Sequence, residues 1–343
     1  MRRRTMKEVA KEASVACSTV SRYINHSGYV DSETGERIAQ AIHKLNYTLP
    51  SHERASFIKK NVIVLSVTDI GNPYYSVLAR HLQAMLYEKG YTMVLFDSKD
   101  GKLELDAIKL AEEINAKGLI VGTINYTDAT RAAIQKVSVP TVIVNASADG
   151  SIDCVHVDAD NATYIAAKHL LSLGHRHIVY AGGLPRTMIG LSRRLGYLRA
   201  LDEYDIVPGP QDVIEHGLSQ EDGYEIGRLI AGRKEHPTAI CCANDIIALG
   251  LLAALQERGI KIPDDISVTG VDDIIYAQKF TPSLTTVTNN PRHFAEKGID
   301  LLLSRIDGSR SGDPIDIAVS HRLIMRASTA PPKGYVRGEP AAN

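Results

Sequence analysis

Residues 5–25 read TMKEVAKEASVACSTVSRYIN, and this stretch predicts two short helices separated by a tight turn. Thr5 followed three residues later by Glu8 is a capping-box pattern, in which each side chain accepts a hydrogen bond from the other residue's backbone N–H. We expect a first helix over residues 6–12 and a second over residues 17–25. Two helices separated by about three residues are typical of a helix-turn-helix motif. A three-helix bundle with no ligand is the simpler alternative.

The outward side of the second predicted helix favours a nucleic-acid partner. It carries Ser18, Thr19, Ser21 and Arg22. Short hydroxyl groups suit phosphate oxygens, and a guanidinium fork suits guanine in the major groove. Asp31 is placed to cap a third helix that runs through Leu45 and completes the bundle.

The length and charge distribution of the chain indicate that this bundle is a small part of a larger protein. The chain has 343 residues, of which 44% are hydrophobic and 23% charged, an ordinary globular composition for two or three domains. The net charge of −1 is unevenly spread, because residues 1–60 carry eleven basic and six acidic side chains, a net of +5, which leaves −6 for the remainder. A small basic module on a mildly acidic body favours a polyanionic partner.

The sequence argues against a membrane protein or an exported one. No stretch approaches the roughly 20 apolar residues of a membrane span, and no apolar core follows the opening arginines. The cysteines form no CxxC pair, which suits small apolar side chains in a reduced cytoplasm. They are Cys17, Cys154, Cys241 and Cys242. We therefore expect a cytoplasmic protein with no metal, no cofactor and no membrane partner.

From Asn61 onward, buried strands alternate with amphipathic helices, which predicts doubly wound parallel sheets. A first group of apolar runs comprises residues 62–67, 92–96, 119–122 and 141–144. A second group comprises residues 178–181, 213–215, 239–242 and 267–270. The repetition predicts two similar α/β lobes, one after the other. Since such sheets bind ligands at the carboxyl ends of their strands, two facing lobes imply a cleft that closes by hinge motion.

Catalytic and metal-binding motifs are missing from the body. It has no GxGxxG loop, Walker loop or GxSxG elbow. Gly174-His175-Arg176-His177 is accounted for by a helix-to-strand turn. Asp272 and Asp273 are adjacent at a strand end, where neighbouring side chains point apart, so they do not form an acid/base pair. We expect no catalytic residues and no enzymatic activity.

The head resembles that of the LacI/GalR family of bacterial transcription regulators. The resemblance rests on KEVAKEASVACSTVSRYIN at residues 7–25 and TGERIAQAIHKLNY at residues 34–47. It implies that Cys17, Ser18 and Arg22 read bases. The DNA-binding set that it implies also includes Thr5, Thr19, Ser21, Asn25 and Thr34, mostly at phosphates. Two positions depart from the family pattern, because Ser14 replaces the usual glycine of the turn and Ala16 the usual serine cap.

The resemblance continues through the body, from about Thr5 to Ser328. It rests on IGNPYYSVLARHLQ at 70–83, LLSLGHRHIVYAGG at 170–183, PTAICCANDIIALGLLAAL at 237–255 and DDISVTGVDDIIYAQKFTPSLTTV at 264–287. It implies a body similar to periplasmic sugar-binding proteins, with three crossovers between the lobes and a final helix, near residues 294–306, that returns to the first lobe. The fold class is thus a helix-turn-helix head plus a two-lobed α/β body.

The family's effector contacts correspond here to Tyr74, Tyr75, Asn145, Arg193, Asn244, Asp272 and Asn289. Charged and amide groups of this kind suit the adjacent hydroxyls of a sugar. Two simpler interpretations stay open, because Arg193 and Arg194 form a pair that fits a solvated helix face, and Asn244 fits a helix cap. Leu218 stands where many relatives have an aromatic ring and Gly122 where some have a polar side chain. A small carbohydrate is favoured over a purine, and a phosphorylated sugar stays open.

We predict a head over residues 1–48, a hinge linker over 49–60, a two-lobed effector and dimerisation domain over 61–330 and a disordered tail over 331–343. In the family an apolar side chain of the hinge enters the minor groove as a lever. An ungapped alignment places Ser56 there and a one-residue slip places Phe57. We predict Phe57, because only an apolar wedge offsets the cost of unstacking bases.

The sequence therefore predicts a cytoplasmic repressor that binds a pseudo-palindromic operator as a homodimer, with a tetramer left open, and whose DNA affinity depends on a bound small molecule. The alternatives are a sugar-binding protein with no regulatory role and a regulator that responds to a purine or a phosphorylated metabolite.

Overall fold

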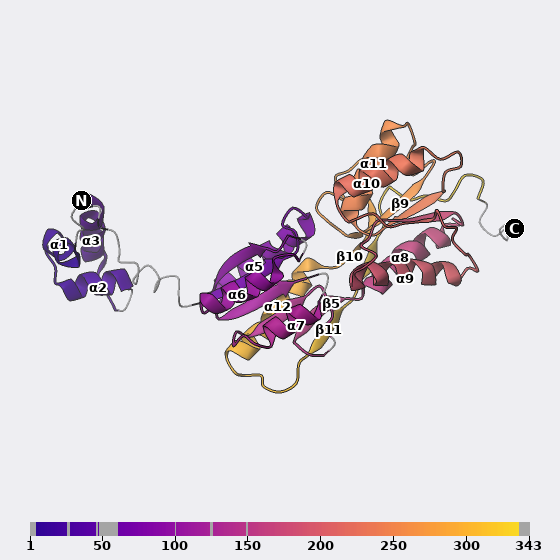
Figure 1. Ribbon diagram of the computed structural model, residues 1–343. Coiled ribbons are helices and arrows are strands. Elements are labelled where there is room, and N and C mark those ends of the chain that lie inside the picture. The colour runs from indigo at the N-terminus through magenta and orange to yellow at the C-terminus, as the bar shows by residue number, and fades with distance from the viewer. Residues whose placement is uncertain are drawn as a thin grey trace. The chain divides into compact units, whose positions relative to one another are not determined.

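The computed structural model describes residues 5–25, 28–45, 47, 61–99, 101–123, 126–148 and 150–335. The chain divides into two compact units, residues 1–62 and residues 63–343 (Figure 1). We call the first unit the head and the second the body. The predicted linker over 49–60 lies outside the described residues. The predicted tail lies outside them from residue 336, while Lys333 before it contacts Asp265 at 2.5 Å.

Three helices form the head: α1 (Met6–Glu12), α2 (Cys17–Asn25) and α3 (Ser32–Lys44). The predicted capping box is present, with the Glu8 carboxylate accepting from the Thr5 backbone N–H at 2.7 Å. Asp31 caps α3 by accepting from the Thr34 backbone N–H at 2.9 Å. The local signals read from the sequence thus correspond to the starts of two helices.

An apolar cluster holds the three helices together. It consists of Val9, Ala10, Ala13, Val20, Ile38, Ala41 and Tyr47, all buried. The turn between α1 and α2 contains Ser14 in the left-handed region, with φ of 56°. That conformation favours glycine and costs an L-residue on the order of 1 kcal/mol, so Ser14 is expected to weaken the turn relative to glycine.

The body contains twelve named strands in its described part. The strands are β1 (Val62–Val67), β2 (Thr92–Asp97), β3 (Gly118–Gly122), β4 (Thr141–Val144), β5 (Cys154–Val157), β6 (Ile178–Ala181), β7 (Val213–Ile214), β8 (Ala239–Cys242), β9 (Ser267–Asp272), β10 (Thr285–Thr288), β11 (Asp316–Val319) and β12 (Arg322–Ile324). The helices are α5 (Pro73–Glu88), α6 (Glu104–Glu113), α7 (Asp128–Ile134), α8 (Ala159–Ser172), α9 (Met188–Asp202), α10 (Gln220–Ala231), α11 (Asp245–Glu257) and α12 (Pro291–Ile306).

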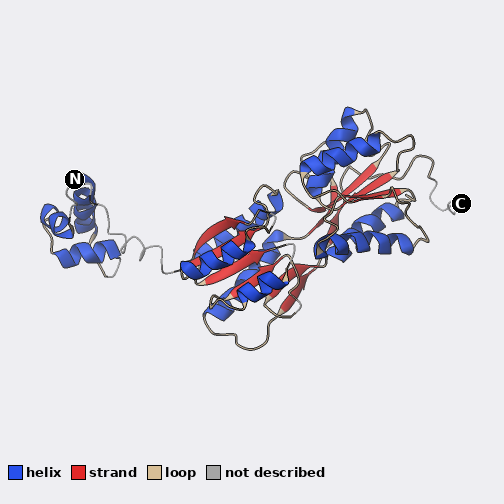
Figure 2. Cartoon of the chain, viewed as in Figure 1, coloured by secondary structure: helices blue, strands red, loops and turns tan. Residues whose placement is uncertain are grey.

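The strands form two sheets of six, each with helices on both faces (Figure 2). The first sheet has the order β11-β5-β4-β3-β1-β2 and the second β12-β10-β9-β8-β6-β7. We call the parts built on them the first and second lobes. Successive strand residues face opposite helix layers, so that Ile63 packs toward α5 and α12 while Val64 packs toward α6 and α7. In β8, Cys241 and Cys242 divide between the two faces in the same way.

Three segments cross between the lobes, at residues 157–159, 288–291 and 319–322. Through the second of them α12 returns to the first lobe, where it packs against α5, β3 and β4. The lobes are therefore interleaved in sequence. The strand pattern alone, which predicted one lobe after the other, was wrong on this point, while the crossovers implied by the family resemblance are confirmed.

Four strands were not predicted from the sequence: β5, β10, β11 and β12. Each has only three or four residues, and none is a continuous apolar run, because polar side chains such as His156 or Arg322 interrupt it. β12 also pairs antiparallel with β10, which departs from the fully parallel expectation for the second sheet.

Two glycines allow the helices of the second lobe to pack closely. A Cβ atom at Gly196 in α9 would lie 2.0 Å from the backbone oxygen of Asp160 in α8. One at Gly250 in α11 would lie 1.9 Å from the backbone oxygen of Gln220 in α10. Real Cβ atoms do not approach that closely, so these helix pairs depend on glycine at the crossing point.

The turn Gly174-His175-Arg176-His177 joins α8 to β6, as predicted, and holds a buried histidine. His175 Nδ1 lies 3.0 Å from Thr238 Oγ1, and its Nε2 lies 2.9 Å from the Ala330 backbone oxygen. Burial lowers the pKa of His175 to about 4. The ring therefore ties the end of the described chain to the second sheet in its neutral form.

His175→Gln is expected to reduce the loss of stability in acid. The unfolded chain takes up a proton near pH 6.5, whereas folded His175 resists it until about pH 4, so its contribution is complete above pH 6.5 and is lost as the pH falls. Between pH 7 and pH 5 the wild type should lose about 2 kcal/mol more free energy of unfolding than the variant. Urea unfolding at both pH values measures this, and an equal loss in the wild type and the variant would contradict it.

Candidate functional site

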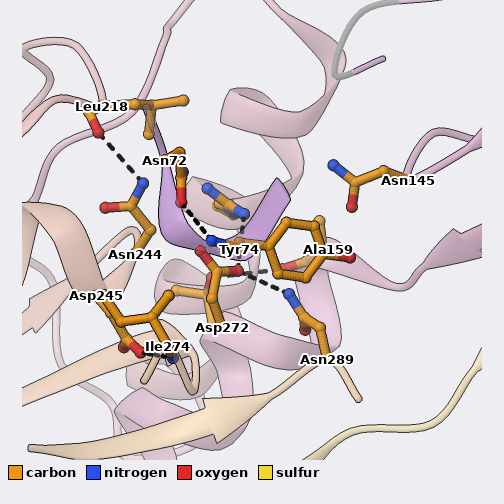
Figure 3. A network of polar contacts seen from close by, with 12 residues as sticks. Asn72, Tyr74, Asn145, Ala159, Leu218, Asn244, Asp245, Asp272, Ile274 and Asn289 are labelled. Atoms are coloured by element: carbon orange, nitrogen blue, oxygen red, sulfur yellow. Dashed lines mark hydrogen bonds and ion pairs between the residues drawn. The ribbon is translucent and has the colours of Figure 1, made fainter. Parts of the chain in front are cut away.

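A cavity of about 460 Å³ lies in the body beyond the carboxyl ends of strands from both sheets. We call it the first cavity. Its lining residues are Thr68, Asp69, Asn72, Tyr74, Tyr75, Lys102, Asn145, Leu184, Arg193, Gly217, Leu218, Ser219, Asp222, Asn244 and Asp272. Six of the seven effector contacts implied by the family resemblance line this space. The seventh, Asn289, contacts Asp272 (Figure 3).

A buried charge pair lies at the centre of the site. Arg193 from α9 and Asp272 at the end of β9 are 7% and 5% exposed, and their Nη2 and Oδ1 atoms are 3.9 Å apart. Asn289 Nδ2 donates to the same Asp272 oxygen at 2.8 Å. Burial raises the pKa of Asp272 to about 6, and Arg193 opposes that shift. Near pH 7 the carboxylate is therefore mainly ionised and remains an acceptor.

Two buried polar atoms of this cluster lack a protein partner in the described chain, namely Arg193 Nε and Asn289 Oδ1. One is a donor and the other an acceptor. A buried polar group without a hydrogen bond costs about 1–3 kcal/mol. The cluster is therefore suited to a ligand that supplies both kinds of hydrogen-bonding group.

Arg194 and Asp273, which follow Arg193 and Asp272 in the sequence, form ion pairs with other residues. Arg194 pairs with Glu215 at 3.1 Å, so the Arg193–Arg194 pair is not a solvated helix face. Asp273 pairs with Arg326 at 2.6 Å, away from Asp272. The expected divergence of the adjacent carboxylates is confirmed.

Asn244 has two roles in the structure. Its Oδ1 accepts from the Ile247 backbone N–H at 2.8 Å, which caps α11, and its Nδ2 donates to the Leu218 backbone oxygen at 3.3 Å (Figure 3). The simpler interpretation as a cap is thus confirmed. Because Asn244 also lines the first cavity, the cap fixes its amide at the wall of that cavity.

An aromatic pair forms the wall contributed by the first lobe. Tyr74 and Tyr75, in the first turn of α5, have ring centroids 5.3 Å apart in an edge-to-face arrangement. Asn145 Nδ2 donates to Tyr75 Oη at 3.1 Å, whereas Tyr74 Oη is buried without a protein partner in the described chain. Burial raises the pKa of Tyr75 to about 12 and that of Tyr74 well above its usual value, so both phenols stay neutral donors.

A second buried carboxyl supports the floor of the site. Asp245 accepts from the Ile274 backbone N–H at 2.9 Å and from Thr286 Oγ1 at 2.5 Å. Burial first, and then the neighbouring Asp272 charge, raise its pKa well above the usual range. Asp245 does not line the first cavity, so its effect is to hold β9, β10 and α11 together beneath Asp272.

Several lining residues were missed from the sequence. Asn72 and Ser219 are the N-caps of α5 and α10, and Asp222 completes the capping box of α10. A signal was available, because helix caps that follow parallel strands lie at the ligand-binding edge of a sheet. Lys102 had no such signal. Gly122, noted as a departure, does not line the cavity, and a Cβ there would lie 3.1 Å from the Ser66 backbone oxygen.

In the head, the residues predicted to contact DNA lie mainly on α2. Cys17, Ser18 and Arg22 are exposed, and Thr19 and Ser21 are partly buried. Thr34 accepts from Arg37 at 3.0 Å, and exposed Thr5 caps α1. The side chain of Asn25, and Ser56 and Phe57 of the linker, lie outside what the structure describes. The roles of these residues at DNA remain predictions.

No helix in the described part of the chain combines the length and apolar character needed to cross a membrane.

Comparison with known proteins identifies both units. Residues 5–50 match the family model for bacterial regulatory proteins of the lacI family, and residues 167–329 match the periplasmic binding protein-like domain. The chain is 33% identical over 332 residues to the HTH-type transcriptional repressor PurR of Pectobacterium carotovorum subsp. carotovorum (strain PC1), covering 95% of this chain and 97% of that protein.

Solved structures agree with this relationship. A LacI family transcriptional regulator from Enterococcus faecium with bound ribose has a TM-score of 0.71 at 28% identity, covering 80% of this chain and all of that one. The lac repressor dimer bound to operator and the anti-inducer ONPF has a similar fold, with a TM-score of 0.76 at 24% identity over 96% of this chain and all of that one. The chain therefore belongs to the lacI family of bacterial regulatory proteins and is a DNA-binding repressor with an effector-binding body.

Proposed function

We propose that the effector is a neutral carbohydrate bound in the first cavity, and that its binding changes the affinity of the repressor for its operator. The observation that carries this proposal is the Arg193–Asp272 pair together with two buried atoms that lack a protein partner in the described chain, Arg193 Nε and Asn289 Oδ1. Adjacent sugar hydroxyls both donate and accept, which is the combination that this cluster requires.

The charge of the cavity disfavours an anionic effector. Three carboxylates, Asp69, Asp222 and Asp272, line it against two cations, Lys102 and Arg193. Arg193 already faces Asp272, so a phosphate would have to compete with a buried carboxylate for the same guanidinium. A neutral ligand avoids that repulsion.

The shape of the aromatic wall disfavours a purine. Tyr74 and Tyr75 pack edge to face against each other rather than presenting two parallel ring faces. Across the cavity stands Leu218, which gives apolar contact but no ring on which a base can stack. The relative from Enterococcus faecium was solved with bound ribose, which is consistent with a sugar in the same fold.

Regulation then follows from the crossovers. Three short segments connect the lobes, so a ligand that contacts both lobes favours one angle between them. The resulting change in operator affinity is limited by the ligand's difference in affinity for the two arrangements.

We further propose that the repressor acts in the cytoplasm as a homodimer on a pseudo-palindromic operator. A head of this size has too few contacts for high operator affinity by itself, and two heads match a two-fold site. Both lobes carry exposed apolar side chains that can contribute to a dimer surface. They include Tyr87, Leu95, Leu229, Ile275 and Tyr276.

Sugar binding is expected to weaken by about tenfold between pH 7.5 and pH 5, because Asp272 with a pKa of about 6 loses its acceptor role on protonation. Calorimetry with the tightest binder of a pentose and hexose panel measures this. Asp272→Asn should bind weakly at both pH values with no such dependence. Equal wild-type affinity at both values would exclude Asp272 as an acceptor for the ligand.

Arg22→Ala is expected to cost about 1–3 kcal/mol of binding free energy at the operator and much less on random DNA, because a guanidinium that reads a base discriminates between sequences. Fluorescence anisotropy with both duplexes tests this. Lys7→Ala is the control, because Lys7 is a basic residue of α1 rather than of the recognition helix, and loss of a charge that attracts phosphates weakens both complexes alike. Equal losses of Arg22→Ala on the two duplexes would refute base reading.

A fragment of residues 61–343 is expected to fold, dimerise and bind the same sugar with unchanged affinity, while losing DNA binding. The expectation follows from the division of the chain near Val62 and from the location of the first cavity entirely within the body. Sedimentation velocity and calorimetry on the fragment measure both properties. If sugar binding disappears with the head, the assignment of the first cavity is wrong.

A further inference from the structure

The third crossover carries a histidine where the connection between the two lobes is very short. Only Ser320 and His321 separate β11 of the first sheet from β12 of the second, and only Asp158 separates β5 from α8. Segments this short must change their backbone torsions when the angle between the lobes changes. A side chain that contacts two of them therefore responds to the arrangement of the lobes.

His321 makes such a contact. Its Nε2 lies 2.7 Å from the Asp158 backbone oxygen, so one hydrogen bond joins the first and third crossovers. Because a carbonyl oxygen can only accept, Nε2 carries the proton. In the neutral ring Nδ1 is then an acceptor, and it is buried without a protein partner in the described chain. The hydrogen bond therefore needs no charge on the ring, and a second proton would have to bind at the buried Nδ1.

The surroundings of the ring oppose that second proton. Burial has the largest effect and lowers the pKa of His321, and the charge of Arg193 in α9 acts in the same direction. The backbone and the carboxylate of Asp158, together with the Thr288 backbone at the end of β10, oppose this lowering of the pKa without cancelling it. The same carboxylate caps α8 by accepting from the Asn161 backbone N–H at 3.0 Å. An arrangement of the lobes that exposed His321 to water would bind the proton more readily.

We propose that His321 is a pH-sensitive latch: the neutral ring holds the first and third crossovers together, and protonation releases them toward a different angle between the lobes. The latched arrangement resists protonation, so it is fully favoured above pH 6.5 and becomes less favoured as the pH falls below that value. A single proton changes the ratio of the two arrangements by at most about tenfold between pH 7.5 and pH 5.5. Only the consequence for operator affinity rests on the regulation by lobe angle proposed above.

Hydrogen exchange on the full chain, without ligand or DNA, tests the latch at pH 7.5 and pH 5.5. Exchange rates are corrected for the intrinsic effect of pH and followed in peptides that contain residues 155–161, 286–292 and 317–324. Protection of these peptides in the wild type should fall at the lower pH. Asp272, with a pKa of about 6, also titrates in this range and contacts Asn289 of the second crossover, so the decisive comparison is between the wild type and a variant of His321.

Two variants separate the proton from the hydrogen bond. In His321→Gln the side-chain amide can still donate to the Asp158 backbone oxygen but does not titrate, so the wild type should lose up to about tenfold more protection than this variant. His321→Ala removes the hydrogen bond and should show low protection at both pH values. His236→Gln is the matched control, because exposed His236 lies 3.4 Å from the Ala231 backbone oxygen, outside the crossovers. It should keep the wild-type pH dependence, and circular dichroism checks that each variant is folded.

The outcomes separate the latch from the regulation proposed above. If His321→Gln loses as much protection as the wild type at pH 5.5, or if the wild type loses none, the latch is refuted. Fluorescence anisotropy with the operator at both pH values is the second measurement. If the exchange result is as expected but the wild type and His321→Gln show the same pH dependence of operator affinity, the latch is supported and regulation through the lobe angle fails.

Discussion

The first cavity depends on the cost of burying Arg193 beside Asp272. Both side chains are almost completely buried, and removing one member of such a pair would leave an uncompensated charge in a poorly solvated interior. The 3.9 Å separation indicates attraction without a close hydrogen bond, so part of the bonding capacity of the guanidinium remains unused. A ligand that bonds to the remaining guanidinium donor would therefore satisfy a buried polar group.

Two polar residues beside the Arg193–Asp272 pair, Asp245 and Asn289, are arranged around its charges. Asp245 lies close to it, and burial together with the Asp272 charge raises the pKa of Asp245, which disfavours a second negative charge in the same interior. Asn289 donates to the Asp272 carboxylate from the crossover at residues 288–291, which links the charge pair directly to a segment that connects the two lobes. The charge pair and one of the connections between the lobes therefore share a hydrogen bond.

Much of the fold could be predicted from the sequence, because long apolar runs and helix caps are local signals. The strand at Val62–Val67 and the capping box at Thr5 are examples. The short strands β5, β11 and β12 had no such local signal, because their extended conformation depends on pairing with strands that are distant in the sequence. In the site, family resemblance indicated residues on regular elements, such as Arg193 and Asp272. Lys102 was not predicted, because its place beside the cavity depends on tertiary structure.

The interleaving of the lobes has a consequence for how the protein is made. The head can fold as soon as it leaves the ribosome, because its described core is built from residues 6–47. The first lobe cannot complete its sheet or cover one of its faces until α12 and β11, close to the end of the chain, have been synthesised. The strands β1 to β5 therefore lack β11 and the helix that covers one face of their sheet while nearly the whole second lobe is translated. During synthesis, the head is thus complete well before either half of the sensor that regulates it.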